Sequence, residues 1–218
     1  MFFLEKDSFE FPDPLSLHTH KDGPLATGGN LQKDNLWKAY LLGIFPWSKT
    51  GENILWWSPD PRFALLPDQL KVSKSMRNLL KKPVFSFTEN SRFEEVISFC
   101  QSIPRKNQSG TWLCKDLLNS FVELHKEGKA HSIEVWHDKK LAGGFYGLWI
   151  GKIFSGESMF SKMSNASKAG FIHFVQEHKN YLDLVDCQVY SAHLESLGAK
   201  NISRKSFLEI LHKQKIRP

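Results

Sequence analysis

The chain has 218 residues, a formal net charge of +6 and a hydrophobic share of 41%, a composition typical of a globular protein with one sizeable core. No apolar run approaches the roughly 20 residues that span a bilayer, so no membrane segment is predicted. The three cysteines and nine histidines show neither a C-x-x-C pair nor any other metal-ligand spacing, which indicates a reduced, metal-free protein.

The first thirty residues are rich in proline, glycine and polar side chains, and we expect a loop in FPDPLSLHTHKDGPLATGG, residues 11–29. A helix is predicted in LQKDNLWKAYLLG, residues 31–43, with Asn30 as its N-cap and Gly43 at its end. Two prolines end the later segment ILWWSPDPR, and we place a domain boundary near Arg62. The sequence therefore predicts a small N-terminal domain, residues 1–62, and a second domain, residues 63–218.

The second domain alternates strands and helices. Strands are predicted in FALL, VFSFT, HSIEVWH, LAGGFYGLWIG, KIFSGESMF and LVDCQVY. Helices are predicted in SKSMRNLLKK, RFEEVISFC, DLLNSFVELHKEG, NASKAGFIHFVQEH, HLESLG and SRKSFLEILHKQ, the last with Ser203 as its N-cap. Three consecutive strands followed by helix, strand and helix predict an α+β fold with a mixed sheet, in the order seen in acetyltransferase-like folds.

Residues 71–82, KVSKSMRNLLKK, carry five cations and no acid. The apolar side chains fall at helical spacing on one face, and Lys74, Arg77 and Lys81 fall on another. The cationic face is either simply solvated or contacts phosphates, and the sequence leaves both interpretations open. The glycines of AGGFYG also have two interpretations, which are close backbone approach within a sheet and space for a ligand.

Polar side chains interrupt two strands that otherwise look buried. Asp186 and Gln188 are two residues apart in LVDCQV, so they share one face of a strand, and Glu157 lies in FSGESMF. A buried carboxylate is costly unless it is partnered, and a lone buried Glu is more often structural than catalytic. Gathered together and fringed by Phe145, Met159 and Phe174, these groups would form an apolar pocket with a polar floor, as in an enzyme or a ligand-binding protein.

Nine motifs, in this order, make the assignment specific: PLATGGNL, AYLLGIFPW, LWWSPDPR, GTWL, AHSIEVW, LAGGFYG, GESMFS, NASK and DCQV followed by HLESLGA. With them the chain closely resembles the bacterial leucyl/phenylalanyl-tRNA–protein transferases over residues 24–211. The resemblance implies a small N-terminal domain and an acetyltransferase-like C-terminal domain. It also implies a cytoplasmic enzyme, with neither metal nor small cofactor, that moves Leu or Phe, and less readily Met, from tRNA to the α-amine of proteins beginning with Arg or Lys, and so marks them for degradation.

The resemblance also implies roles for individual residues. Asp186 and Gln188 match the proposed catalytic relay, and Glu157 matches an important polar residue of the active site. The other roles it implies are a pocket for the amino acid (Phe145, Met159, Phe174), a site for the terminal adenosine of the tRNA (Trp47, Trp112) and a basic cluster for the acceptor stem (Arg77, Lys81, Lys82). Phe145 departs from the Met that is common in the family, which puts the preference among Leu, Phe and Met in question.

The implied reaction is aminolysis of an ester by an α-amine, whose reference pKa of about 7.7–8.0 leaves a useful neutral fraction at pH 7. Gln188 can orient the amine by accepting a hydrogen bond, and Asp186 can polarise Gln188 or hold a cationic amine. Selection of Arg or Lys requires negative charge near the pocket mouth, for which Glu157 and Asp186 are the candidates. We expect the protein to act as a monomer.

Two other functions compete with this interpretation. A small-molecule acetyltransferase on the same fold would carry a glycine-rich loop opening a helix for the pyrophosphate of its cofactor, whereas this chain has MSNASK at that place. A non-enzymatic RNA-binding module would explain the basic helix and the seven tryptophans, but not an acid, an amide and a Glu gathered on apolar strands.

Overall fold

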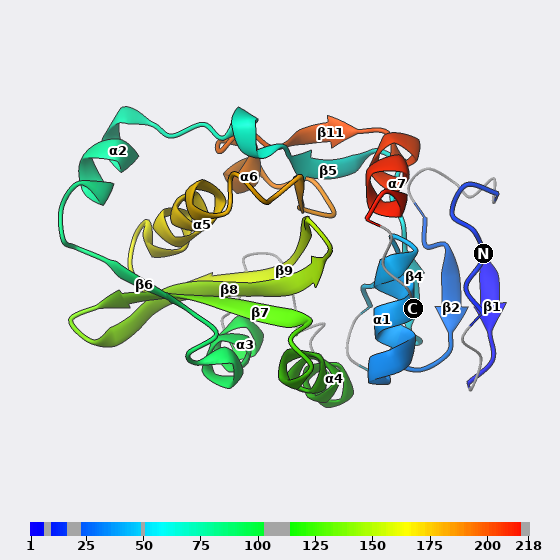
Figure 1. The fold of residues 1–218 in the computed structure, drawn as a ribbon. Coiled ribbons are helices and arrows are strands. Elements are labelled where there is room, and N and C mark those ends of the chain that lie inside the picture. Colours follow the sequence, from blue (N-terminus) through cyan, green and yellow to red (C-terminus); the bar gives the residue numbers. More distant parts are fainter. Residues whose placement is uncertain (7–9, 17–22, 49–50, 103–113, 215–218) are drawn as a thin grey trace.

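A computed structural model describes residues 1–6, 10–16, 23–48, 51–102 and 114–214. The chain forms a four-stranded sheet and a seven-stranded sheet, and the N-terminus lies at the edge of the smaller sheet (Figure 1). Along the sequence, the last strand of the smaller sheet ends at Trp57, and the first strand of the larger sheet begins at Arg62. A domain division near residue 62 remains a prediction, because one continuous hydrophobic cluster includes side chains from both sides of it.

The smaller sheet has the strand order β1-β2-β4-β3 and is covered by helix α1. Its elements are β1 (Phe2–Leu4), β2 (Ala26–Gly28), α1 (Lys33–Leu41), β3 (Phe45–Pro46) and β4 (Leu55–Trp57). The prediction of a loop in FPDPLSLHTHKDGPLATGG, residues 11–29, was wrong at its end, since the short strand β2 lies there. The N-cap is Gln32 rather than Asn30, whose side-chain oxygen instead accepts the Gln32 N–H at 3.0 Å, and Gly43 ends the helix region at φ 73° as predicted.

The larger sheet is mixed, with the strand order β11-β5-β10-β9-β8-β7-β6, and this confirms the predicted α+β class. Its strands are β5 (Arg62–Leu65), β6 (Ser86–Glu89), β7 (Ala130–His137), β8 (Lys140–Ile150), β9 (Ile153–Ser161), β10 (Leu184–Asp186) and β11 (Lys200–Ile202). Strand β10 runs parallel to β9, and the other neighbouring strands are antiparallel. The sequence did not predict β11, whose three residues are too short and polar to show strand periodicity.

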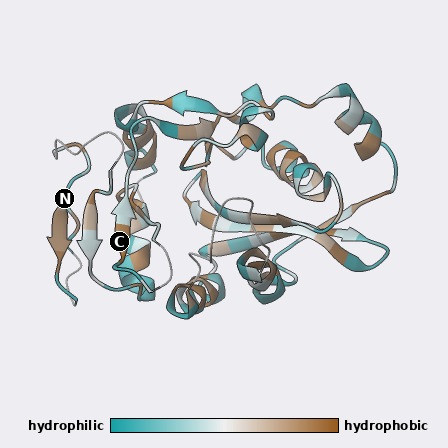
Figure 2. Ribbon diagram, turned by 180° about the vertical axis from the view of Figure 1, so that it is seen from behind, coloured by the Kyte–Doolittle hydropathy of each residue, from teal (hydrophilic) through white to brown (hydrophobic). Residues whose placement is uncertain are grey.

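Helices cover both faces of the larger sheet (Figure 1). They are the 3-10 turn η1 (Pro67–Gln69) and the helices α2 (Lys74–Leu80), α3 (Phe93–Ser102), α4 (Lys115–Lys126), α5 (Ala166–Glu177), α6 (Ala192–Glu195) and α7 (Arg204–His212). Helix α5 packs on one face, and α3 and α4 pack on the other. These helices carry both hydrophilic and hydrophobic residues (Figure 2). A helix that packs one face on a sheet and exposes the other to solvent needs both kinds. Ser203 caps α7 as predicted, accepting the Ser206 N–H at 3.1 Å.

The glycines of AGGFYG serve close backbone approach. A Cβ at Gly147 would lie 2.2 Å from the Ser155 carbonyl oxygen on β9, and one at Gly143 would lie 2.9 Å from the Ala166 Cβ at the start of α5. Neither distance is sterically possible, so these positions let β8 pack against its neighbours. Of the two interpretations of this motif, close packing is therefore the one these two positions favour.

Candidate functional site

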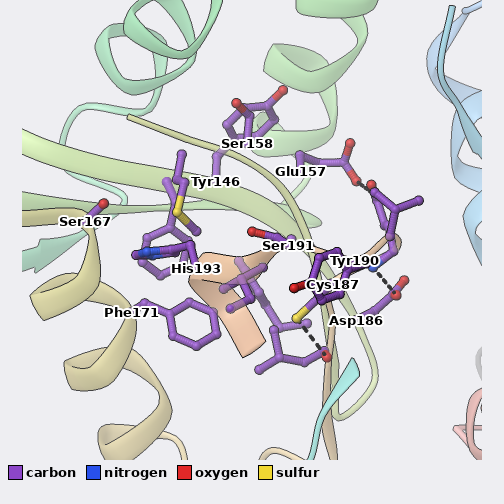
Figure 3. Close-up of a pocket in the computed structure, with 18 residues that line it drawn as sticks. Tyr146, Glu157, Ser158, Ser167, Phe171, Asp186, Cys187, Tyr190, Ser191 and His193 are labelled. Carbon is purple, nitrogen blue, oxygen red and sulfur yellow. Dashed lines mark hydrogen bonds between the residues drawn. The ribbon is translucent and has the colours of Figure 1, made fainter. Parts of the chain in front are cut away.

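The candidate site is a pocket of about 400 Å³ between β9 and the segment that follows β10. The two strands pair only as far as Ser155 and Asp186 and then diverge, which opens the space. Carboxyl and amide groups lie at one end, and Phe171, Ser167 and His193 lie at the other (Figure 3). The site is therefore an elongated cavity with an apolar body and a polar end.

A β-bulge places Glu157 in this pocket. Tyr146 on β8 pairs with Ser158, and Gly147 pairs with Gly156, so Glu157 is an extra residue with no partner on β8. Bulges of this kind occur beside active sites, where they redirect a side chain. The strict alternation assumed from the sequence fails at this residue, but the predicted direction of Glu157 toward the pocket holds.

Asp186 is buried and is held from three sides. Its carboxylate accepts two hydrogen bonds from the Arg62 guanidinium, at 2.8 Å from Nε and 2.6 Å from Nη2. Ser155 Oγ donates a third bond at 3.1 Å, and the Gln188 main-chain N–H donates a fourth at 2.9 Å. A buried carboxylate with this many charge-assisted and neutral hydrogen bonds is held in one position and anchors the pocket floor.

Arg62 is as buried as its partner, with 1% of its surface exposed. Its third hydrogen bond goes to the Gly43 carbonyl oxygen at 3.2 Å, and its guanidinium lies over the rings of Phe45 and Phe207, 4.8 and 4.4 Å from their centroids. The ion pair thus joins β3 of the small sheet, α7 and the pocket floor. In the sequence, Arg62 indicates only the position of the predicted domain boundary. A single arginine at the start of a strand carries no signal of its partner.

Gln188 lies in a tight turn rather than in the predicted strand, which ends at Asp186. Its φ is 62°, and the Val189 N–H donates to the Cys187 carbonyl oxygen across it at 2.7 Å, which is a γ-turn. A non-glycine residue in this region is strained, and such strain is typical of functional sites. The turn brings Gln188 beside Glu157, and the Gln188 Nε2 donates to the Glu157 Oε1 at 2.7 Å.

The electrostatics favour a protonated Glu157 at neutral pH. Burial raises the pKa of its carboxyl to about 8, while the nearby Tyr40 hydroxyl and the hydrogen bond from Gln188 oppose the shift. The side chain remains partly exposed where it faces the pocket, and exposure to solvent moderates the shift. Burial raises the pKa of Tyr40, and the neighbouring Glu157 carboxyl raises it further.

Tyr40 is a second residue that sequence analysis missed. It comes from α1, next to the small sheet, yet its side chain is buried beside Glu157. Among the described residues its hydroxyl has no partner in ordinary hydrogen-bond geometry. In the sequence it is one of several large side chains in the helix predicted at residues 31–43, and helical periodicity carries no signal of a polar partner.

Taken together, the geometry shows which groups of Asp186, Gln188 and Glu157 contact one another. Asp186 contacts Gln188 through the main-chain N–H and so fixes the turn, whereas the partner of the Gln188 side chain is Glu157. With Nε2 donating to Glu157, the amide oxygen of Gln188 is the atom left to accept a hydrogen bond from a ligand. The polar end of the pocket can therefore orient a donor group rather than abstract a proton from it.

The apolar body of the pocket contains two of the three predicted walls. Phe145 and Met159 line the cavity and pair with each other across β8 and β9. Phe174 is fully buried and lies behind the lining, with its ring centroid 5.6 Å from that of Phe145. Phe154 and Phe171 line the pocket and were not singled out, because nothing in the sequence distinguishes them from other core phenylalanines.

Of the two tryptophans expected to hold an adenosine, Trp47 follows β3 and is 37% exposed. Its ring centroid lies 5.6 Å from that of Trp57, whose indole N–H donates to the Trp47 carbonyl oxygen at 2.6 Å. An exposed indole supported from behind is a suitable stacking surface. Trp112 lies outside the described residues.

The basic segment forms a shorter helix than predicted. Helix α2 begins at Lys74, with the Ser73 hydroxyl accepting the Met76 N–H at 3.2 Å, so residues 71–73 precede it. Met76 is buried, and the predicted cluster of Arg77, Lys81 and Lys82 is exposed. Within the described part of the chain these three cations form no ion pair, so their charge is available to a partner.

In the described ranges, no group of three or more His, Cys, Asp or Glu side chains is placed to hold a metal ion. The same ranges contain no helix with the length and apolar character to cross a membrane.

The family models and the curated relatives that match this chain agree on one family. The family model described as leucyl/phenylalanyl-tRNA protein transferase matches residues 64–212, and the model of that family's N-terminal domain matches residues 29–60. Leucyl/phenylalanyl-tRNA–protein transferases from Flavobacterium johnsoniae and Christiangramia forsetii are 52% and 48% identical, over 97% of this chain and 99% and 100% of theirs. A solved structure titled "Crystal structure of FemX" is 11% identical, with a TM-score of 0.47 over 81% of this chain and 70% of that one.

Proposed function

The chain belongs to the leucyl/phenylalanyl-tRNA protein transferase family, and we propose that it moves Leu or Phe, and less readily Met, from tRNA to the α-amine of proteins that begin with Arg or Lys. The observation that carries the proposal is the apolar pocket whose polar end is the Gln188–Glu157 pair, anchored by Asp186 and Arg62. We further propose that the products are degraded and that the enzyme acts in the cytoplasm as a monomer.

In this proposal the side chain of the donor amino acid lies in the apolar body of the pocket, against Phe145 and Met159, with Phe174 supporting the wall from behind. Burial of apolar surface then supplies the affinity for Leu and Phe. Because one methylene in such a pocket changes binding by only about 1–3 kcal/mol, selection among unbranched-at-β apolar side chains is loose. The ester carbonyl lies at the polar end, and the terminal adenosine stacks on Trp47 and Trp112.

The reaction then proceeds as aminolysis of the ester. The neutral α-amine of the acceptor attacks the ester carbonyl carbon, a C–N bond forms, and the C–O bond to the ribose breaks. The amine loses one proton, and the departing ribose oxygen gains one. The Gln188 amide oxygen accepts a hydrogen bond from the amine and so directs its lone pair at the carbonyl. Glu157, protonated at neutral pH, keeps the Gln188 amide in this orientation without adding a competing charge.

The basic surface on α2 takes the acceptor stem of the tRNA in this proposal. Arg77, Lys81 and Lys82 are exposed and free of ion pairs among the described residues, so they can contact RNA phosphates. Contacts of this kind supply affinity without reading sequence, whereas the pocket selects the amino acid.

The proposal is tested with labelled Phe-tRNA, a peptide that begins with Arg, and the wild-type protein beside Gln188→Gly. Glycine keeps the φ of 62° and the main-chain N–H that bonds Asp186, so only the amide side chain is lost. We expect transfer of label by the wild type and a drop of about tenfold or more in the variant, since orientation of the nucleophile is lost.

A wild-type protein that transfers nothing from Phe-, Leu- or Met-tRNA would contradict the proposal. Protection of the wild type against heat by coenzyme A would then support a small-molecule acetyltransferase. Equal binding of charged and uncharged tRNA without turnover would support an RNA-binding module.

A further inference from the structure

Recognition of a cationic acceptor residue needs negative charge, and the two carboxyl groups expected to supply it from the pocket do not. Asp186 is neutralised by its two bonds to Arg62 and is 1% exposed. Glu157 lies in surroundings that keep it protonated at neutral pH. A cation brought to the pocket would therefore meet a charge-balanced floor, and selection for Arg or Lys must come from elsewhere.

An exposed carboxylate, Glu195 at the C-terminal end of α6, lies beside the same pocket and is bonded to a residue of its lining; we call this place the rim of the pocket. Tyr190 lines the pocket and is 59% exposed, and its hydroxyl donates to the Glu195 Oε2 at 2.8 Å. Within the described part of the chain, Glu195 forms no ion pair, and its second oxygen, Oε1, accepts no side-chain hydrogen bond. The nearby Lys168 instead bonds the Ser196 hydroxyl at 3.4 Å.

The exposed ring of Tyr190 adds a second feature that suits a cation. The Tyr190 side chain is held in place at both ends. Its ring packs against that of Phe63, with 5.4 Å between centroids, and its hydroxyl donates a hydrogen bond to Glu195. A guanidinium or ammonium group that reaches the rim can approach the ring and the free carboxylate oxygen together. The carboxylate and the ring together would thus bind a positively charged side chain of the acceptor, whereas a neutral side chain would find no partner there.

We propose that Glu195, held in place by Tyr190, is the residue that selects the cationic side chain of the acceptor's first residue. This inference rests on the proposed function, because it assigns the acceptor side of that reaction. The donor amino acid occupies the pocket below, and the acceptor amine reaches the ester at Gln188 while its side chain extends to the rim. Glu195 is a specificity determinant and takes no part in bond making.

The test compares two acceptor peptides that differ in charge alone. One begins with Arg and the other with citrulline, which is the neutral isostere of Arg. We expect the wild type to prefer Arg in kcat/KM, and Glu195→Gln to reduce that preference about three- to fivefold through KM for the Arg peptide, with kcat unchanged. Such a modest change is what an exposed charge supplies.

Two further variants separate this role from a general effect of charge or folding. Glu177→Gln removes one exposed carboxylate from the C-terminal end of α5 and should leave the Arg preference unchanged. Tyr190→Phe keeps the ring and releases the carboxylate, so it should give a smaller loss of the Arg preference. The double variant, Tyr190→Phe with Glu195→Gln, should lose no more of that preference than Glu195→Gln alone.

The outcomes distinguish the two proposals. Transfer to the Arg peptide with the same preference over citrulline in Glu195→Gln as in the wild type would overturn the inference and leave the transferase function standing. An equal loss with both peptides would also overturn it. A wild type that transfers to neither peptide would overturn the proposed function and this inference together.

Discussion

Two regions of this molecule carry polar groups in opposite ways. At the pocket floor, Arg62 and Asp186 are each 1% exposed. They form two hydrogen bonds with each other, and further hydrogen bonds from each to neighbouring groups fix their positions. On α2 and directly after it, the side chains of Arg77, Lys81 and Lys82 are exposed and bear no ion pair among the described residues. Positioning a nucleophile demands fixed geometry, whereas contact with a phosphate backbone needs available charge and tolerates mobile side chains.

The difference teaches where each residue's effect should appear. Charges that are buried and compensated contribute through geometry and stability, so their loss is felt in the unfolding free energy as well as in the reaction. Exposed cations contribute through long-range attraction, so their loss appears in affinity and in its dependence on salt. Four tests, with single or combined substitutions, make this contrast measurable, from the largest expected effect to the smallest.

The strongest test breaks the buried pair. Arg62→Leu leaves Asp186 buried without its cation, and we expect a loss of about 3–5 kcal/mol in the free energy of unfolding, measured by urea denaturation. The double variant Arg62→Leu with Asp186→Leu should recover much of that stability, since an apolar pair can replace a buried ion pair. Transfer activity should stay lost in both variants, and its recovery in the double variant would show that the pair has only a structural role.

The second test concerns the protonation of Glu157. A carboxyl whose pKa is about 8 in the folded protein and 4.5 in the unfolded chain favours folding fully below pH 4.5 and loses that contribution as the pH rises toward 8. After allowing for its partial exposure to the pocket, we expect about 2 kcal/mol of this pH dependence to come from Glu157. Urea denaturation at pH 5, 6.5 and 8 should show a flatter profile for Glu157→Gln. Equal pH profiles for both proteins would contradict the assignment.

The third test addresses the α2 surface. Removing all three cations, in Arg77→Ala with Lys81→Ala and Lys82→Ala, should weaken tRNA binding about tenfold and lower the salt slope by about 2 to 3, without changing stability. A matched control removes three exposed lysines on α4, on α7 and at the C-cap of α7, and these helices lie away from α2 (Figure 1): Lys126, Lys205 and Lys213. A similar loss of affinity in the control would show that net charge alone governs binding.

The smallest effect should come from the pocket wall. Phe145→Met replaces a stiff ring with a flexible side chain of similar volume, and the wall can then adapt to donors of different shape. We expect the ratio of Phe to Met transfer to change by about two- to fivefold, measured with matched aminoacyl-tRNAs. An unchanged ratio would indicate that Phe145 does not contact the donor side chain.

The sequence predicted the residues of the site better than their contacts. Asp186, Gln188 and Glu157 meet at one pocket as expected, yet through a γ-turn and a β-bulge that no alternation pattern encodes. Turns and bulges depend on how neighbouring strands pair, which is a long-range property. Phe174 shows the same limit on the apolar side, because aromatic residues of lining and core look alike in sequence.

By itself, the sequence determined the α+β class, the main helices and strands of the large sheet, the family and the cationic surface of α2. Each of these follows from local periodicity, composition or motif order. Tertiary structure alone decided that Arg62 neutralises Asp186, that Tyr40 from α1 reaches Glu157, and that Glu195 remains at the rim without an ion pair among the described residues. The physical reason is that a buried charge is defined by its partner, and the partner of Asp186 lies 124 residues away along the chain.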